Sequence, residues 1–169
     1  MNYEINDTIL YGADGVCQIS EVTERKIDSK ICKYYILNPV YDKKSTIFVP
    51  FENDVLLSKM RNLPTKAEID AALSEAVAKT PVWIEDDGER KEYLKKITDS
   101  GTIFQLLFAV KALYIHQNKQ IDCGKKLHVA DEKSLKDIEK IIFDEFAYVK
   151  GFERPAVKAF IAEKLNNLE

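Results

Sequence analysis

Glycine, proline and long apolar runs are scarce in this sequence. The 169 residues include 6 glycines and 5 prolines, which excludes a collagen-like or low-complexity chain. No apolar run approaches the roughly 18 residues that a membrane-spanning helix needs. The first residues lack the basic stretch and following apolar stretch of a signal peptide. We therefore expect no membrane association and a cytoplasmic location.

Cysteine and histidine are also few, which argues against a metal site. The three cysteines are Cys17, Cys32 and Cys123, and only His116 and His128 could join them. A structural zinc site needs four converging ligands, usually in closely spaced pairs, and these residues are far apart in the sequence. We therefore expect no bound metal.

Motifs of catalysis are missing as well. No glycine-rich phosphate-binding loop follows a strand pattern, and neither histidine lies in a nucleophile motif with serine or cysteine. Acidic pairs occur at Asp86-Asp87 and Asp131-Glu132, but adjacent carboxylates on a turn or helix cap seldom converge on a substrate. We expect a protein that is not an enzyme and needs no cofactor.

The charge balance excludes a protein whose whole surface binds nucleic acid. Lysine and arginine total 25 against 28 aspartates and glutamates, which gives a formal net charge of −3. A nucleic-acid-binding domain that works alone is usually strongly basic. Any contact with DNA must therefore be local, or must be assisted by a second partner.

The hydrophobic pattern changes character near residue 62. Before it, short β-branched and aromatic segments alternate with turn residues, and we expect strands at 9–11, 16–22, 33–37 and 45–49. Such strands favour a small, strongly bent antiparallel sheet or barrel. After residue 62, apolar residues recur at helical spacing. We therefore expect an α+β protein with a β domain at 1–62 and an all-α helical bundle at 63–169.

Local signals place several helix ends. Thr65 fits the start of a capping box, and Gly151 fits the residue that follows a long helix. Asp131 is expected to cap the beginning of that long helix. His116 and His128 are expected to have ordinary surface or cap roles.

Trp83 is the only tryptophan, and it follows Pro81 and precedes an acidic run at 85–87. In one interpretation its ring anchors the helical core near Leu94 and Leu106. In the other it is an exposed apolar wedge, because apolar side chains can enter the DNA minor groove and hold a base step partly unstacked. The residues alone leave both interpretations open.

Lysines of the second half could form a phosphate-contacting patch. Lys91 and Lys95 share one face of an expected helix, and further lysines lie at and after the next connection between helices: Lys119, Lys125, Lys126 and Lys133. The alternative is a solvated face with ordinary ion pairs. A phosphate patch would make binding salt-dependent, whereas the acidic run at 85–87 would oppose it.

Short blocks spread along nearly the whole chain carry a family resemblance. They lie at residues 6–11, 15–19, 34–37, 46–53, 61–63, 83, 94–97 and 100–101. In this order they resemble the CarD/CdnL family of transcription regulators. Asn6 replaces the opening glycine of the family pattern, and the residues after the family's tryptophan, often basic, are acidic here.

The resemblance implies a fold and two contacts. The first domain would be a Tudor-like small β-barrel that binds the β subunit of bacterial RNA polymerase through Arg25, Ile47, Phe48 and Pro50, with Phe48 at a position that is basic in the family. The helical domain would contact promoter DNA at the upstream edge of the −10 region. Trp83 would be its wedge, and we expect phosphate contacts from nearby lysines: Lys91, Lys95, Lys125, Lys126 and Lys133.

We therefore expect a monomeric bacterial transcription regulator that stabilises the open promoter complex. The alternative is an interaction module that binds polymerase or another partner but no DNA. A third possibility is a Tudor-type RNA or peptide binder. Its aromatic cage would need solvent-facing side chains at Tyr11, Tyr34, Tyr35 or Phe48.

Overall fold

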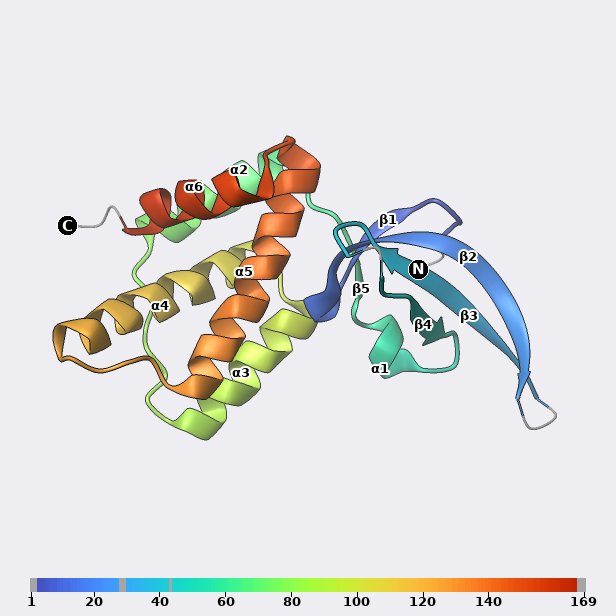
Figure 1. Ribbon diagram of the computed structural model, residues 1–169, viewed down its shortest axis with the longest axis horizontal. Coiled ribbons are helices and arrows are strands. Elements are labelled where there is room, and N and C mark those ends of the chain that lie inside the picture. The colour runs from blue at the N-terminus through green and yellow to red at the C-terminus, as the bar shows by residue number, and fades with distance from the viewer. Residues whose placement is uncertain (1–2, 28–29, 43, 167–169) are drawn as a thin grey trace. The chain divides into compact units, whose positions relative to one another are not determined.

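The computed structural model describes residues 3–27, 30–42 and 44–166 of the chain. They form an α+β structure in which an antiparallel five-stranded sheet is followed by helices (Figure 1). The chain divides into two compact units, Met1–Leu63 and Pro64–Glu169. None of the helices in the described ranges is long and apolar enough to cross a lipid bilayer.

All four expected strands are present, and the sheet contains a fifth. In the order β4-β3-β2-β1-β5, the strands are β1 (Thr8–Tyr11), β2 (Gly15–Ile27), β3 (Lys30–Pro39), β4 (Ile47–Pro50) and β5 (Met60–Asn62). A short helix, α1 (Asp54–Leu57), precedes β5. Three residues are too few to show an alternating pattern, so the sequence does not indicate β5. The outer strands of the described sheet are β4 and β5.

A β-bulge in β2 decides which side chains face the core. The register between β2 and β3 shifts at Ser20, whose hydroxyl donates a hydrogen bond to the carbonyl of Ile36 (3.1 Å). One extra residue reverses the alternation of faces. Ile19 and Val22 therefore both pack into the core although they are three residues apart. Beyond the bulge, Arg25 lies on the opposite, outer face.

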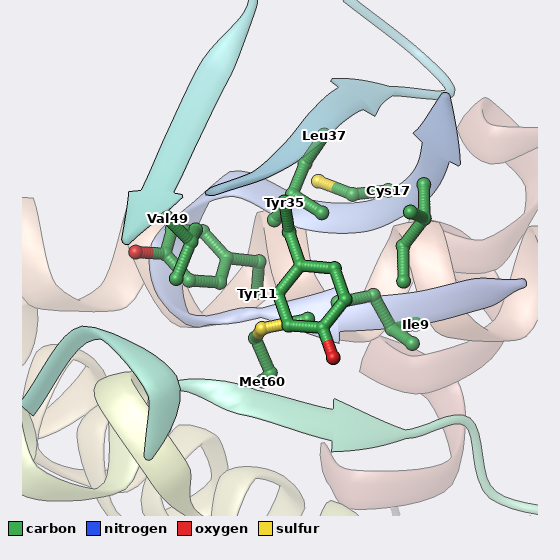
Figure 2. Packing of buried hydrophobic residues seen from close by; sticks show 8 residues of the cluster. Ile9, Tyr11, Cys17, Tyr35, Leu37, Val49 and Met60 are labelled. Carbon is green, nitrogen blue, oxygen red and sulfur yellow. The ribbon is translucent and has the colours of Figure 1, made fainter. Parts of the chain in front are cut away.

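The core of the first unit lies on one face of this sheet. Figure 2 shows side chains from all five strands pointing toward one another, namely Ile9, Tyr11, Cys17, Tyr35, Leu37, Val49 and Met60. Tyr11 and Tyr35 are only 5% and 4% exposed. These two rings are therefore not available to the aromatic cage of a Tudor-type RNA or peptide binder, whereas Tyr34 is half-buried and Phe48 is exposed.

The second unit is built from helices in the described residues 64–166. They are α2 (Lys66–Ala78), α3 (Asp87–Ser100), α4 (Ile103–Asp122), α5 (Val129–Lys150) and α6 (Arg154–Asn166). In Figure 1, α5 runs beside α3, α4 and α6, and α2 packs against α4. The predicted apolar stripes supply the buried residues, including Leu106, Val110, Ile138, Ile142 and Phe146. The helical periodicity of this half is thus confirmed.

Two predicted helix ends are confirmed and one is wrong. Thr65 caps α2 in a capping box, and Gly151 ends α5 in the left-handed conformation with φ 75°. Asp131 is not the cap of α5, because His128 holds that position and α5 begins at Val129. Asp131 lies one turn later and is buried, because its carboxylate binds Arg90 of α3.

Candidate functional site

The outer face of the sheet carries an exposed cation beside an exposed aromatic ring. The guanidinium carbon of Arg25 on β2 lies 4.7 Å from the centre of the Phe48 ring on β4. Phe48 is 41% exposed, and Arg25 is exposed as well. A cation over an aromatic face is attracted to the ring, by about 0.5–1 kcal/mol at an exposed site. Two of the residues predicted to contact polymerase are therefore neighbours in space.

The other two predicted contact residues are less accessible. Ile47 is half-buried and packs against the core of the sheet. Pro50 is half-buried and lies opposite Tyr34 in the β3–β4 ladder. Arg25 and Phe48 therefore form the exposed part of this candidate site, and we call these two residues the Arg25–Phe48 pair.

β4 lies at the edge of the described sheet, and on its side away from β3 the carbonyl of Pro50 accepts a hydrogen bond from the amide of Asn53 (3.2 Å). The amide of Phe51 donates to the carbonyl of Lys33 (2.8 Å). In an antiparallel ladder, hydrogen-bonded pairs alternate with pairs that are not hydrogen-bonded. Val49 is therefore also hydrogen-bonded to β3, and the N–H and C=O of Phe48 point away from β3. An outer strand of this kind can pair with a strand from another protein.

In the helical unit, Trp83 lies in the segment that joins α2 to α3. Its ring stacks on His116 of α4, with ring centres 3.7 Å apart and planes within 4° of parallel. The guanidinium carbon of Arg90 lies 4.6 Å from the centre of the Trp83 ring. The side chain of Trp83 is half-buried, and its contacts with His116 and Arg90 anchor the ring to α4 and α3.

Arg90 uses all five of its N–H groups within this cluster. Nε and Nη2 donate to the two carboxylate oxygens of Asp131, both at 2.9 Å. Nη1 donates to the carbonyls of Ile84 (2.7 Å) and Glu85 (3.2 Å), and Nη2 also donates to Asp87. A guanidinium has five donors, so this one is fully satisfied. Its hydrogen bonds to Asp131 are the main cause that raises the pKa of Arg90.

Two residues of the acidic run have roles inside the protein. Asp86 caps α3 by accepting a hydrogen bond from the amide of Glu89 (2.8 Å). Asp87 binds Arg90, and this hydrogen bond lowers the pKa of the Asp87 carboxyl. Glu85 keeps an exposed side chain. The single positive charge of Arg90 is shared by two carboxylates, so the surroundings of Trp83 remain acidic.

Lys111 fixes the opposite end of the segment that carries Trp83. Its side chain is 1% exposed, and its Nζ donates to three carbonyls at the end of α2, those of Ala76, Val77 and Lys79. These carbonyls have no partner further along the helix, so the buried ammonium group takes that place. Burial lowers the pKa of Lys111.

The predicted DNA-contacting lysines are exposed, and none of them lines the two described cavities that Trp83 lines. Tyr93 of α3 lines a small cavity together with Trp83. Lys91 and Lys95 are each two residues from Tyr93, about 200° around the helix, so they face away from this cavity. The remaining three are exposed at or after the connection of α4 and α5: Lys125, Lys126 and Lys133.

A second basic side chain near Trp83, besides Arg90, is Lys119 of α4. It lines a cavity with Pro81, Trp83 and His116. His116 and Lys119 are three residues apart and therefore share one face of the helix. The role of His116 is missed from the sequence, where helical spacing links it to Lys119 but nothing links it to Trp83.

The stack of Trp83 on His116 should make tryptophan fluorescence depend on pH. Burial, followed by the charge of Arg90, lowers the pKa of His116. An imidazolium ring quenches a stacked indole, so emission should stay constant near neutrality and fall only below about pH 6.5. His116→Gln should abolish this step, and His128→Gln should retain it. A step that survives His116→Gln would contradict the stacked geometry.

Comparison with known proteins assigns the first unit. Residues 3–61 match the family model of the CarD-like/TRCF RID domain, and no curated protein matches the sequence significantly. This domain type suggests a non-catalytic module that interacts with RNA polymerase. The matched residues include the Arg25–Phe48 pair, whereas the helical unit lies outside them. Residues 3–61 are therefore similar to the CarD-like/TRCF RID domain, and this match is consistent with a CarD-like family.

Proposed function

We propose that this protein is a bacterial transcription regulator of the CarD/CdnL type. In this proposal its Tudor-like first unit binds the β subunit of RNA polymerase in the cytoplasm. The helical unit stabilises the open promoter complex. The observation that carries the proposal is the family match over residues 3–61, which contain the exposed Arg25–Phe48 pair beside an outer strand.

The polymerase contact combines a strand edge with one charge. A strand of the β subunit would pair with the outer side of β4, where the backbone groups of Phe48 point outward. Pro50 has no N–H and its carbonyl already accepts from Asn53, which limits this ladder to a short segment. Arg25, held over the Phe48 ring, would bind a carboxylate of the partner. The pair thus supplies one cation and an apolar ring in place of two basic side chains.

Reversing the charge of Arg25 tests this contact. Arg25→Glu should abolish co-purification with the β subunit and leave the circular-dichroism spectrum and melting temperature unchanged, because the side chain is exposed. Lys26→Glu is the matched control, since Lys26 is the next residue, is also exposed and lies on the other face of β2. Equal binding by wild type and Arg25→Glu would refute the assignment.

The proposed DNA contact is weak on its own and depends on tethering. Trp83 would lie at the upstream edge of the −10 region and insert beside a base step. Polymerase binding would raise its effective concentration there. A protein that binds the open complex better than the closed one shifts the population toward it. Five exposed lysines are the predicted phosphate contacts: Lys91, Lys95, Lys125, Lys126 and Lys133. Replacing one of them with alanine should reduce the slope of the logarithm of the DNA-binding constant against the logarithm of salt concentration by about one unit for each lost phosphate contact.

The acidic surroundings of Trp83 favour a second candidate, an interaction module that binds polymerase or another partner without DNA. Carboxylates at Glu85, Asp86 and Asp87 repel phosphates, and the predicted lysines do not lie beside the ring. Titration of Trp83 fluorescence with forked promoter DNA separates the two. A response only in the presence of polymerase supports tethered DNA binding, and no response in either case supports the interaction module.

A further inference from the structure

The geometry points to Arg90 as the positioning residue that holds the indole ring of Trp83 in one orientation. The connection from a fixed ring to promoter binding rests on the proposed function. The role of Arg90 itself concerns the free protein and can be tested there.

Arg90 has no hydrogen-bonding capacity left for a ligand. Its five donors are occupied by Asp131, Asp87 and the carbonyls of Ile84 and Glu85. The side chain is 7% exposed. Arg90 therefore cannot act as a phosphate contact, although it is a basic residue next to the proposed wedge. Its charge and shape act within the protein.

The contacts of Arg90 converge on the segment that carries Trp83. Two of its donors bind the carbonyls of the two residues that immediately follow Trp83, and a third binds Asp87 at the start of α3. The guanidinium also lies 4.6 Å from the ring centre. The backbone after the ring and the ring itself are thus held by the same planar group.

Asp131 fixes the guanidinium in turn. The bidentate pair joins α3 to α5 across 41 residues of sequence, and the Asp131 side chain is 5% exposed. Parallel hydrogen bonds to a carboxylate specify the plane of a guanidinium as well as its position. Asp131 therefore acts on Trp83 through Arg90.

If the only role of Arg90 and Asp131 were to hold α3 against α5, a buried ion pair would not be needed. Apolar side chains of similar volume can join helices equally well, and they would leave the carbonyls of Ile84 and Glu85 to solvent. Holding Trp83 instead removes rotamer freedom before a partner arrives, so less freedom is lost on binding. The stack on His116 acts in the same direction.

The test measures the mobility of the only tryptophan. Arg90→Lys keeps the charge but loses the planar fork, and Asp131→Asn keeps the shape but loses a carboxylate oxygen as acceptor. In both variants we expect faster loss of Trp83 fluorescence anisotropy and stronger quenching by acrylamide, with unchanged helical circular dichroism. Lys96→Met, which changes an exposed lysine of the same helix, should match the wild type. If either variant is unfolded, Asp87→Ala loosens the guanidinium without leaving a buried charge unpaired.

A double-mutant cycle then connects the ring to function. Arg90→Lys should shorten the open-complex lifetime in the wild-type background and have no further effect in the Trp83→Ala background. Unchanged Trp83 mobility in folded Arg90→Lys and Asp131→Asn would overturn the positioning role. Increased mobility together with an open-complex lifetime that is insensitive to Trp83→Ala would leave the positioning role standing and refute the promoter half of the proposed function.

Discussion

Replacing Asp131 with alanine should lower the free energy of unfolding of the helical unit by about 3–5 kcal/mol. The substitution removes the partner of a guanidinium that is itself only 7% exposed. Two N–H donors then lose their acceptors where water has little access, and the positive charge remains. Urea unfolding of the full chain, followed by Trp83 fluorescence, measures this loss in the helical unit alone because the sheet contains no tryptophan.

The adjacent Glu132 provides the matched control for this prediction. Glu132 forms an ion pair with Lys136 one turn later on α5, and both side chains are largely exposed, at 49% and 69%. Exposed pairs at this spacing contribute about 0.3–0.5 kcal/mol. Glu132→Ala should therefore change stability little. Similar losses for Asp131→Ala and Glu132→Ala would show that the buried pair does not hold α3 to α5.

The substitution Trp83→Ala should shorten the lifetime of the open promoter complex while polymerase binding is retained. An inserted apolar ring offsets part of the few kcal/mol that unstacking a base step costs, and alanine cannot replace it. Because the ring is half-buried, the accompanying loss of stability should remain below the roughly 3–5 kcal/mol typical of a fully buried aromatic residue. Promoter dissociation assays at temperatures below the melting transition measure the lifetime.

Trp83→Phe separates the wedge from the anchor. Phenylalanine keeps an apolar ring for a base step, so the lifetime should fall less than with alanine. If open complexes formed with folded Trp83→Ala and wild-type protein have the same lifetime, the ring is an anchor of the helical unit. The interaction module would then be the better description, with the polymerase contact at the Arg25–Phe48 pair unaffected.

Local chemistry was enough to predict most elements of this chain, although not the three-residue strand β5. Alternation with period 2 and apolar recurrence at helical spacing indicate which backbone pattern buries each segment. Thr65 and Gly151 mark helix ends because their own side chain or conformation satisfies backbone groups a few residues away. The resemblance of the first unit also depends on short local blocks. The family match to residues 3–61 confirms that part.

Only the tertiary structure decided which side chains meet. The bulge at Ser20 turns Arg25 to the outer face, where it meets Phe48 from another strand. Asp131 fits the local sequence pattern of a helix cap. In the structure it instead accepts hydrogen bonds from the buried guanidinium of Arg90, 41 residues away. A buried charge needs its partner wherever the chain supplies one. Distant pairs of this kind leave no periodic trace in the sequence, so the arrangement around Trp83 becomes visible only after the helices have packed.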